Sequence, residues 1–354
     1  MFVAWRDLRF ARGRFALMAS VVVLITMLVG LLSGLTAGLA RDTTSAVTDL
    51  PADHLVFAAP PDGQQPSFTS SSIDRDLWQR WAEVPGVRAA EPLGITTGYA
   101  ESGEATAAVT AFGVRPDSPL APLPSAVGSG TALLSTGAAD ALGVGTGDAV
   151  TLAGQRLRVE AVDVDASYSH MPVIWTNLAT WQQLARTDSA TVLALTTDAG
   201  TDLAAADAAL GTLTLTRTDA LSAIGSYTAE NGSLQLMRGL LFAISALVIG
   251  AFFTVWTIQR SGDIAVLKAL GAGTGHLLRD ALGQALVLLV GGTAIGTGLA
   301  AALGALAAET VPFVLDIGTI AIPAAILVVL GLLGAALAVR RITAVDPLTA
   351  LSAR

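Results

Sequence analysis

Side chains that could bind a ligand gather at the start of a long apolar segment in the second half of the chain. Tyr227, Glu230, Met237 and Arg238 provide a phenol, a carboxylate, a thioether and a guanidinium within twelve residues. Glu230 and Met237 are seven residues apart, so a helix places them on one face. Ionisable side chains at the boundary of an apolar helix indicate a functional site. For Arg238, extension of the guanidinium toward a membrane surface is an equally good explanation.

A second soft side chain, Met27, lies in the first apolar segment on the same stripe as three glycines. Gly30, Gly34 and Gly38 have the spacing that lets two membrane helices approach closely. Because offsets of seven and eleven residues return to nearly the same helical face, Met27 could close a flat slot beside these glycines. The alternative is that the glycines pack within the chain and that Met27 only fills space.

The sequence lacks the residues that several other kinds of site require. The chain has no cysteine, which excludes disulfides, thiolate metal sites and iron–sulfur clusters. Its three histidines, His54, His170 and His276, are too scattered to predict a metal site. The pair His170-Met171 is best explained as part of a loop, with a role in ligand handling as the alternative. The single lysine, Lys268, does not follow a glycine-rich loop, so there is no Walker A motif and any ATP is bound by another polypeptide.

Four windows without charged residues predict the helices that carry these side chains. Only 14% of the residues are charged, against about 25% in a soluble domain. The windows cover residues 15–40, 239–259, 281–308 and 317–339, and a helix needs about 20 apolar residues to cross a bilayer. The first window is longer than the core of a signal peptide, so we expect it to be retained. The sequence therefore predicts an α-helical membrane protein with four transmembrane helices in a 1+3 arrangement.

The distribution of charge predicts the orientation. The two termini and the loop 260–280 carry ten basic and four acidic residues, whereas the rest of the chain carries ten basic and 24 acidic residues. By the positive-inside rule, both termini are cytoplasmic in a plasma membrane and the acidic region is outside, which argues against nucleic-acid binding. The expected parts are a cytoplasmic amphipathic helix 1–14, transmembrane helix 15–40, an extracellular domain 41–225, transmembrane helix 226–259 with an outer extension, a cytoplasmic loop 260–280, transmembrane helices 281–308 and 317–339, and a cytoplasmic tail 340–354.

The region between the first two membrane helices has short, mixed patterns typical of an α+β domain. Alternating apolar residues predict strands at 87–95, 105–114, 131–134, 148–152, 155–164, 172–176 and 190–196. Helical spacing predicts helices at 72–83, 137–142, 178–184 and 204–210. No catalytic triad, carboxylate pair or metal-ligand spacing is found there, so we expect no enzymatic activity in this chain.

One loop motif resembles a known family. Residues 259–272 read Gln-Arg-Ser-Gly-Asp-Ile-Ala-Val-Leu-Lys-Ala-Leu-Gly-Ala. This stretch resembles the cytoplasmic loop after the second membrane helix of FtsX/MacB-type ABC transporter permeases, although Asp263 stands where the family usually has Glu. Residues 340–351 are similar to the closing signature of the family, and residues 84–87 and 142–152 resemble motifs of its outer domain. The resemblance extends nearly from end to end.

The resemblance implies a homodimer of permeases that binds two copies of a cytoplasmic ABC ATPase and transmits the closure of the ATPases to the outer domains. It also implies that the loop docks on the ATPase. Three apolar residues of the loop, Ile264, Leu267 and Leu270, share one helical face. Two charged residues, Asp263 and Lys268, flank this face. A short helix with an apolar face needs a covering partner; contact with lipid headgroups is the alternative.

Chain length, a compact outer domain and the sequence Arg-Asp-Leu-Arg at residues 6–9 are similar to the HrtB branch of haem exporters. The similarity implies haem as the transported ligand and no intrinsic cofactor. Haem iron would then be ligated by one of four side chains: Glu230, Met27, Met237 or Tyr227. A propionate of the haem would pair with Arg238. Straight helices would place Glu230 and Met27 at different depths, so we rank Glu230 first.

Two other functions fit the same features. One is a permease that does not transport but controls a cell-envelope hydrolase, as some FtsX-like proteins do. The other is an exporter of a lipid or a peptide. The partners expected in every case are the ABC ATPase, a second copy of the permease and membrane lipids.

Overall fold

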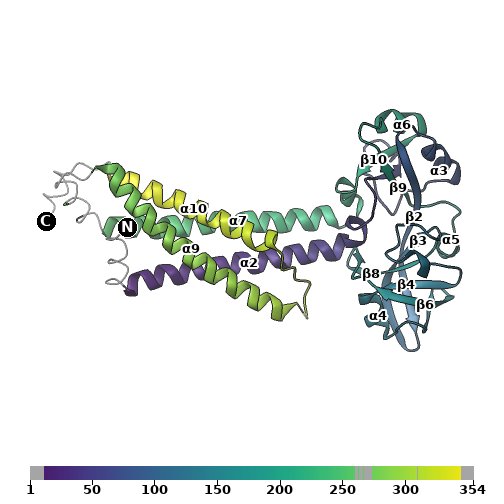
Figure 1. The fold of residues 1–354 in the computed structure, drawn as a ribbon, viewed down its shortest axis with the longest axis horizontal. Helices are drawn as coiled ribbons and strands as arrows, with labels where there is room; N and C mark the ends of the chain where they lie inside the picture. The colour runs from purple at the N-terminus through teal and green to yellow at the C-terminus, as the bar shows by residue number, and fades with distance from the viewer. Residues whose placement is uncertain (1–11, 260–261, 263–265, 267–272, 309, 344–354) are drawn as a thin grey trace. The chain divides into compact units, whose positions relative to one another are not determined.

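The computed structural model describes residues 12–259, 262, 266, 273–308 and 310–343 (Figure 1). The chain divides into two compact units. We call Met1–Gly38 together with Ser233–Arg354 the helical unit, and Leu39–Gly232 the inserted domain. Most of the predicted N-terminal helix 1–14 and of the predicted tail 340–354 lies outside the described residues.

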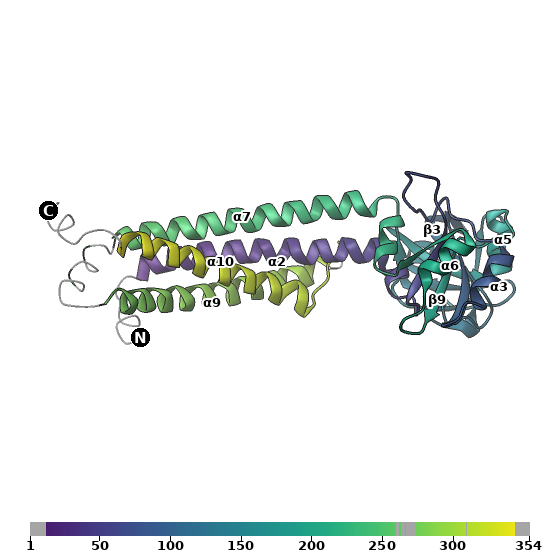
Figure 2. The same cartoon turned by 90° about the horizontal axis from the view of Figure 1, so that it is seen from above.

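Long helices form the helical unit. They are α2 (Arg12–Thr48), α7 (Tyr227–Gln259), α9 (Thr274–Ala307) and α10 (Ile317–Thr343), of which the end of α2 and the start of α7 belong to the inserted domain. Each of the four contains a stretch long and apolar enough to cross a membrane. The helices lie nearly parallel in the view of Figure 2, but α9 and α10 run obliquely to α2 and α7 in the view of Figure 1. The prediction of one membrane helix, a domain and three further membrane helices is confirmed.

All four helices contribute to one apolar core. It includes Met18 and Val22 of α2, Phe253 and Trp256 of α7, Leu288 and Leu289 of α9, and Ala335 and Ala338 of α10. Small residues allow the close contacts between these helices: a Cβ on Gly296 would lie 2.7 Å from the Cβ of Thr26. The buried hydroxyls of Thr257 and Thr293 donate to carbonyls four residues earlier in their own helices, which satisfies them without water.

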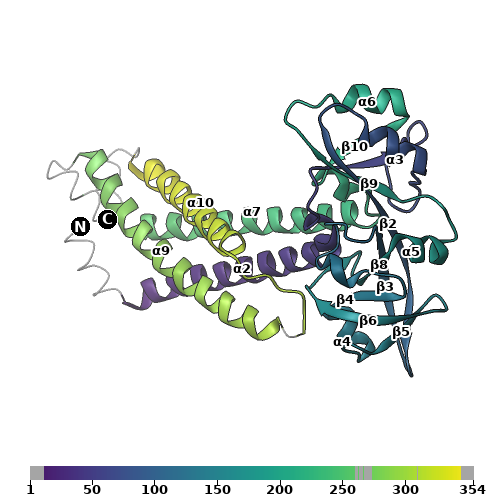
Figure 3. The same cartoon turned by 45° about the vertical axis from the view of Figure 1, so that its right-hand side comes forward.

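The inserted domain is built on one mixed sheet with the strand order β10-β1-β9-β2-β3-β8-β4-β6-β5 (Figure 3). Strand β2 joins two halves of this sheet, because residues 87–93 pair with β9 and residues 94–102 pair with β3. The elements are β1 (His54–Ala58), α3 (Arg75–Ala82), β2 (Val87–Ser102), β3 (Ala105–Val114), β4 (Thr131–Ser135), α4 (Thr136–Leu142), β5 (Ala149–Leu152), β6 (Gln155–Asp163), β7 (Ser167–Tyr168), β8 (Met171–Asn177), α5 (Leu178–Ala185), β9 (Val192–Thr197), α6 (Leu203–Leu210) and β10 (Thr212–Thr216), with short 3₁₀ turns at Pro124–Ala126 and Asp219–Ala223.

Both faces of this sheet are buried. Leu133 packs in one core, whereas its neighbour Leu134 packs in another. Likewise Val173 and Trp175 of β8 enter the first core, and Ile174 between them enters the second. Successive side chains of a strand point to opposite faces, so an almost continuous apolar run is what a strand covered on both sides requires.

The predicted α+β domain is confirmed, but strands β1, β7 and β10 and the full length of α2 were not predicted. Strands β1 and β10 pair with each other at one end of the sheet. Helix α2 continues past its expected limit at residue 40, because Ala46 and Val47 of its last turns are buried in the core of the inserted domain.

Candidate functional site

A β-hairpin with a two-residue turn carries His170, the side chain around which the candidate site is organised. Strands β7 and β8 pair through Tyr168 and Met171, and Ser169 and His170 form the turn between them. Both turn residues have positive φ, 52° for Ser169 and 63° for His170. This conformation matches the type I′ turn that suits the twist of a tight hairpin. The turn therefore presents His170 at the tip of the hairpin.

The hairpin is attached by hydrogen bonds to the end of α2. The backbone N–H of Ser169 donates to the carbonyl of Thr43 at 2.9 Å, and that of His170 donates to the carbonyl of Asp42 at 3.3 Å. The buried hydroxyl of Ser45 accepts from the N–H of Ser167 at 2.8 Å and donates to its carbonyl at 3.3 Å. Four backbone groups of the hairpin thus find partners on one helix.

The imidazole of His170 bridges two carboxylates from two helices. Its Nδ1 lies 2.8 Å from Oδ2 of Asp42 in α2, and its Nε2 lies 3.0 Å from Oε2 of Glu230 in α7. The Oγ1 of Thr43 lies 3.2 Å from the same Nε2. Only the imidazolium form can donate from both nitrogens to both carboxylates. All of these residues belong to the inserted domain.

Opposing effects act on the pKa of His170. Burial is the largest and lowers it, but the hydrogen bonds and negative charges of Asp42 and Glu230 together outweigh burial, so the pKa of His170 is raised. The three side chains are 38%, 32% and 43% exposed for His170, Asp42 and Glu230, so the cluster is open to solvent. Within the described part of the chain no group of His, Asp and Glu residues has a metal-binding arrangement. With His170 protonated, the cluster forms two ion pairs through one imidazolium.

The other predicted ligand residues occupy different surroundings. Tyr227 packs half-buried against the core of the inserted domain. Met237 is 49% exposed and Arg238 is half-buried, and both lie in the part of α7 that belongs to the helical unit. Along a helix, seven residues correspond to a rise of about 10 Å between Glu230 and Met237. Met27 lies half-buried in α2, also in the helical unit.

The glycine stripe of α2 is covered from within the chain. A Cβ on Gly30 would lie 2.8 Å from the Cβ of Ala300 in α9. Gly34 lies against the ring of Phe313 and Gly38 against the backbone of Pro312, both in the connection between α9 and α10. Of the two explanations for Gly30, Gly34 and Gly38, this structure shows packing within the chain, and the slot expected beside them is filled.

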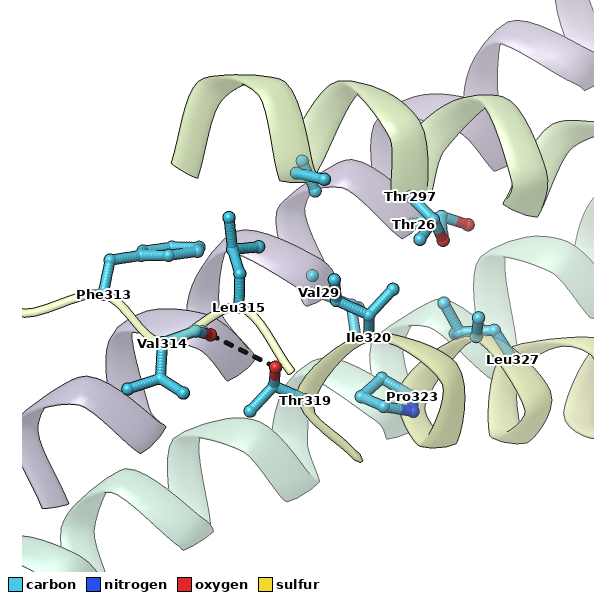
Figure 4. Close-up of a pocket in the computed structure, with 15 residues that line it drawn as sticks. Thr26, Val29, Thr297, Phe313, Val314, Leu315, Thr319, Ile320, Pro323 and Leu327 are labelled. Carbon is cyan, nitrogen blue, oxygen red and sulfur yellow. Dashed lines mark hydrogen bonds between the residues drawn. The ribbon is translucent and has the colours of Figure 1, made fainter. Parts of the chain in front are cut away.

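A small cavity remains beside this stripe (Figure 4). Its volume is about 10 Å³, and Thr26, Phe313 and Pro323 are among its lining residues. The hydroxyl of Thr319 donates to the carbonyl of Val314 at 3.1 Å across one side of it. A space of this size is about that of one water molecule. The Oγ1 of Thr26 is buried and has no hydrogen-bond partner in the described structure, so the cavity offers a polar contact to water.

The predicted ATPase-docking residues cannot be placed. Asp263, Ile264, Leu267, Lys268 and Leu270 all lie outside the described residues.

The sequence did not predict Asp42 and His170 as partners of Glu230. His170 is 128 residues from Asp42 and 60 from Glu230 along the chain, so no local spacing connects them. The available signal was the pair His170-Met171 between two strand-like stretches, which is where a hairpin tip falls. The role of Asp42 was hidden because α2 was expected to end before it.

Comparison with known families identifies the class of protein. The MacB-like periplasmic core domain matches residues 15–213, and the FtsX-like permease C-terminal domain matches residues 236–347. The chain therefore belongs to the FtsX/MacB-type permeases of ABC transporters.

Individual relatives align over almost the whole chain. A Staphylococcus epidermidis protein, named as the HrtB permease of a hemin transport system, is 25% identical over 353 residues, which is 99% of each chain. The ABC transporter permease Rv2563 of Mycobacterium tuberculosis is 26% identical over 349 residues, which is 98% of each chain. The crystal structure of the periplasmic region of MacB from Actinobacillus actinomycetemcomitans has a TM-score of 0.39 at 10% identity, covering 49% of this chain and 92% of that chain.

Proposed function

We propose that this permease exports an amphipathic substrate from the membrane, and that the substrate is haem. The family supports the role of permease, and the name of the staphylococcal relative supports haem. The observation that carries the proposal is the position of Glu230. Its carboxylate is 43% exposed at the start of α7, where an apolar membrane helix meets the polar inserted domain.

The proposed assembly is a homodimer of the permease with two copies of a cytoplasmic ABC ATPase. Both termini and the loop 260–280 face the cytoplasm, and the inserted domain faces outward, as the charge distribution favours. Closure of the ATPases on ATP is passed along the membrane helices to the inserted domains. The continuity of α2 from Arg12 to Thr48 supports this route, because one helix has residues in both compact units.

Glu230 is the side chain proposed to ligate the haem iron. A carboxylate is a hard oxygen ligand suited to ferric iron, and Arg238 lies two helical turns further along α7 as a partner for a propionate. The Oε2 of Glu230 already contacts His170, so iron would bind Oε1 or displace the histidine. Tyr227, Met27 and Met237 remain second choices. Tyr227 packs against a core, and Met27 and Met237 are softer ligands.

A titration of purified permease with haemin tests this assignment. We expect wild-type protein in nanodiscs to shift the Soret band, and Glu230→Gln to weaken binding by at least tenfold because an amide is a poor iron ligand. Glu104→Gln is the matched control, since Glu104 is an exposed carboxylate in the turn between β2 and β3. Equal haemin affinity in wild type and Glu230→Gln would remove Glu230 from the site. Absence of any haemin binding would favour export of a lipid or peptide, or control of a cell-envelope hydrolase.

Coupling to the ATPase is tested separately. Leu267→Asp places a charge on the apolar face that is proposed to dock on the partner, so we expect stimulation of ATP hydrolysis by the permease to be abolished while membrane insertion is unchanged. Normal ATP hydrolysis by the Leu267→Asp complex would refute the docking assignment.

A further inference from the structure

The inserted domain has a cavity where β2 passes from one half of the sheet to the other. Its volume is about 270 Å³, and Ile95, Thr96 and Thr97 of β2 are among its lining residues. Strand β2 pairs with β9 as far as Leu93 and with β5 from Ala100 onward. The cavity therefore lies beside a stretch of β2 that, among the described residues, has a strand partner only on the β3 side.

The unpaired edge of β2 turns backbone groups toward this cavity. The N–H of Ile95 points away from β3 and donates to the hydroxyl of Thr191 at 2.8 Å. In an antiparallel ladder, the N–H and C=O of alternate residues point to the same side of the strand. Those of Thr97 therefore also point away from β3, where no described strand or loop bonds to them. They offer a ligand one donor and one acceptor side by side.

The side chains that line the cavity are neutral and rich in hydroxyl groups. Nine of the fourteen lining residues are serine, threonine or tyrosine, and none is charged. Some of these hydroxyls serve the protein itself: Ser71 donates to a backbone carbonyl at 2.7 Å, and Ser72 donates to the hydroxyl of Ser189 at 2.7 Å. Those of Thr96 and Thr97 bond to no described residue. A lining without charge disfavours an ion, which would lose its hydration and gain no counter-charge.

Tyr168 adds a buried donor without a partner. The residue is only 4% exposed, and its ring packs edge to face against Phe68 and Phe112, with centroids 5.7 Å and 6.0 Å away. Its phenol hydroxyl bonds to no described residue, and burial raises the pKa of Tyr168, so the hydroxyl keeps its proton. Buried donors in proteins nearly always have an acceptor. Because Tyr168 lines the cavity, the missing acceptor has to come from the cavity.

We propose that this cavity binds a neutral sugar. Each hydroxyl of a sugar ring both donates and accepts, which matches the backbone of Thr97 and the phenol of Tyr168. Phe68 and Trp181 also line the cavity, and aromatic side chains suit the apolar C–H face of such a ring. Ligand cavities measure about 300–1,000 Å³, so this one, at the lower end, fits a single ring. The inference goes beyond haem export and does not involve Glu230.

Saturation-transfer NMR on full-length permease in nanodiscs tests the class of ligand. Glucose, glucosamine and glucuronate share one ring and differ in charge at pH 6. We expect saturation transfer to glucose alone, with empty nanodiscs as the background, because an ammonium or a carboxylate finds no counter-charge in the cavity. Equal transfer to all three sugars, or transfer to none, would overturn the proposal. Transfer to a capped trialanine peptide but not to glucose would also overturn it and assign the cavity to a peptide.

Removal of single hydroxyls tests the position of the site. Tyr168→Phe keeps the ring and removes a hydroxyl that has no partner in the protein. We therefore expect an unchanged melting temperature and a Kd for glucose that rises about three- to tenfold. Tyr99→Phe is the matched control, because Tyr99 of β2 is 67% exposed and does not line the cavity.

Thr96→Val is a second test of the same site. It removes a lining hydroxyl that bonds to no described residue and nearly preserves the shape of the side chain. We expect it to weaken glucose binding by a similar factor. Wild-type affinity for glucose in both Tyr168→Phe and Thr96→Val, or an equal loss of affinity in Tyr99→Phe, would overturn the proposal.

Discussion

Helix α2 contacts its neighbours in two different ways along its length. In the helical unit, Gly30, Gly34 and Gly38 contact α9 and the following connection through shape alone. In the inserted domain, Asp42, Thr43 and Ser45 contact the β7–β8 hairpin through hydrogen bonds. A close-packed contact has no room for an added atom, whereas a hydrogen-bonded contact is lost when a donor or an acceptor is removed. The inner stretch should therefore be sensitive to added volume, and the outer stretch to the loss of a polar group.

The largest effect is expected at Gly38, where the inner contact is tightest. A Cβ on this residue would overlap the backbone of Pro312, which cannot move aside as a flexible side chain can. We expect Gly38→Ala to destabilise the permease by about 1–3 kcal/mol, measured by thermal unfolding in detergent. Gly291→Ala in α9 is the control: nothing lies within 4 Å of its added Cβ, and alanine favours the helix. Equal melting temperatures in the two variants would show that the connection does not pack on α2.

A smaller effect is expected at Ser45, the buried residue of the outer contact. Ser45→Ala leaves the N–H of the half-buried Ser167 without its partner, so we expect a loss of about 1 kcal/mol and faster hydrogen exchange confined to the hairpin. Thr48→Ala is the control, because its hydroxyl bonds only to its own helix and the adjacent Asp49. Unchanged exchange at Ser167 in Ser45→Ala would mean that the hairpin does not depend on this contact.

The smallest effect is the pH dependence of stability. The raised pKa of His170 predicts that the contribution of this residue to stability is complete below about pH 6.5 and is lost as the pH rises through that pKa. Because the side chains of His170 and Glu230 are 38% and 43% exposed, solvent screening limits the change to well under about 1 kcal/mol. Thermal unfolding of wild type and His170→Gln at pH 6 and pH 8.5 measures it. An equal pH response of both proteins would assign the effect to other groups.

The fold was largely predictable because two strong patterns determine it. Charge-free windows are long only where a helix must cross a bilayer, so the four membrane helices could be located from composition. The strands of the inserted domain alternate between two cores, as Leu133 and Leu134 do, and this apolar run was visible in the sequence. Strands β1 and β10 escaped prediction; each is five residues long, and β1 lies between β9 and β10, the strand at the end of the sheet.

The site was only partly predictable. Glu230 could be selected because a carboxylate at the start of an apolar helix is unusual. Asp42 and His170 could not be selected from the sequence. The fold of the sheet brings the hairpin tip and the helix end together, and their separation along the chain does not indicate this contact. The role of Gly34 and Gly38 also depended on structure, since small-residue spacing does not say which partner fills the groove.

Haemin-stimulated ATP hydrolysis by the permease–ATPase complex in proteoliposomes tests the central claim most directly. The account predicts that haemin stimulates the wild-type complex and the Glu104→Gln complex, and that stimulation is lost in Glu230→Gln. Stimulation of equal size in Glu230→Gln, or none at any haemin concentration in wild type, would contradict it.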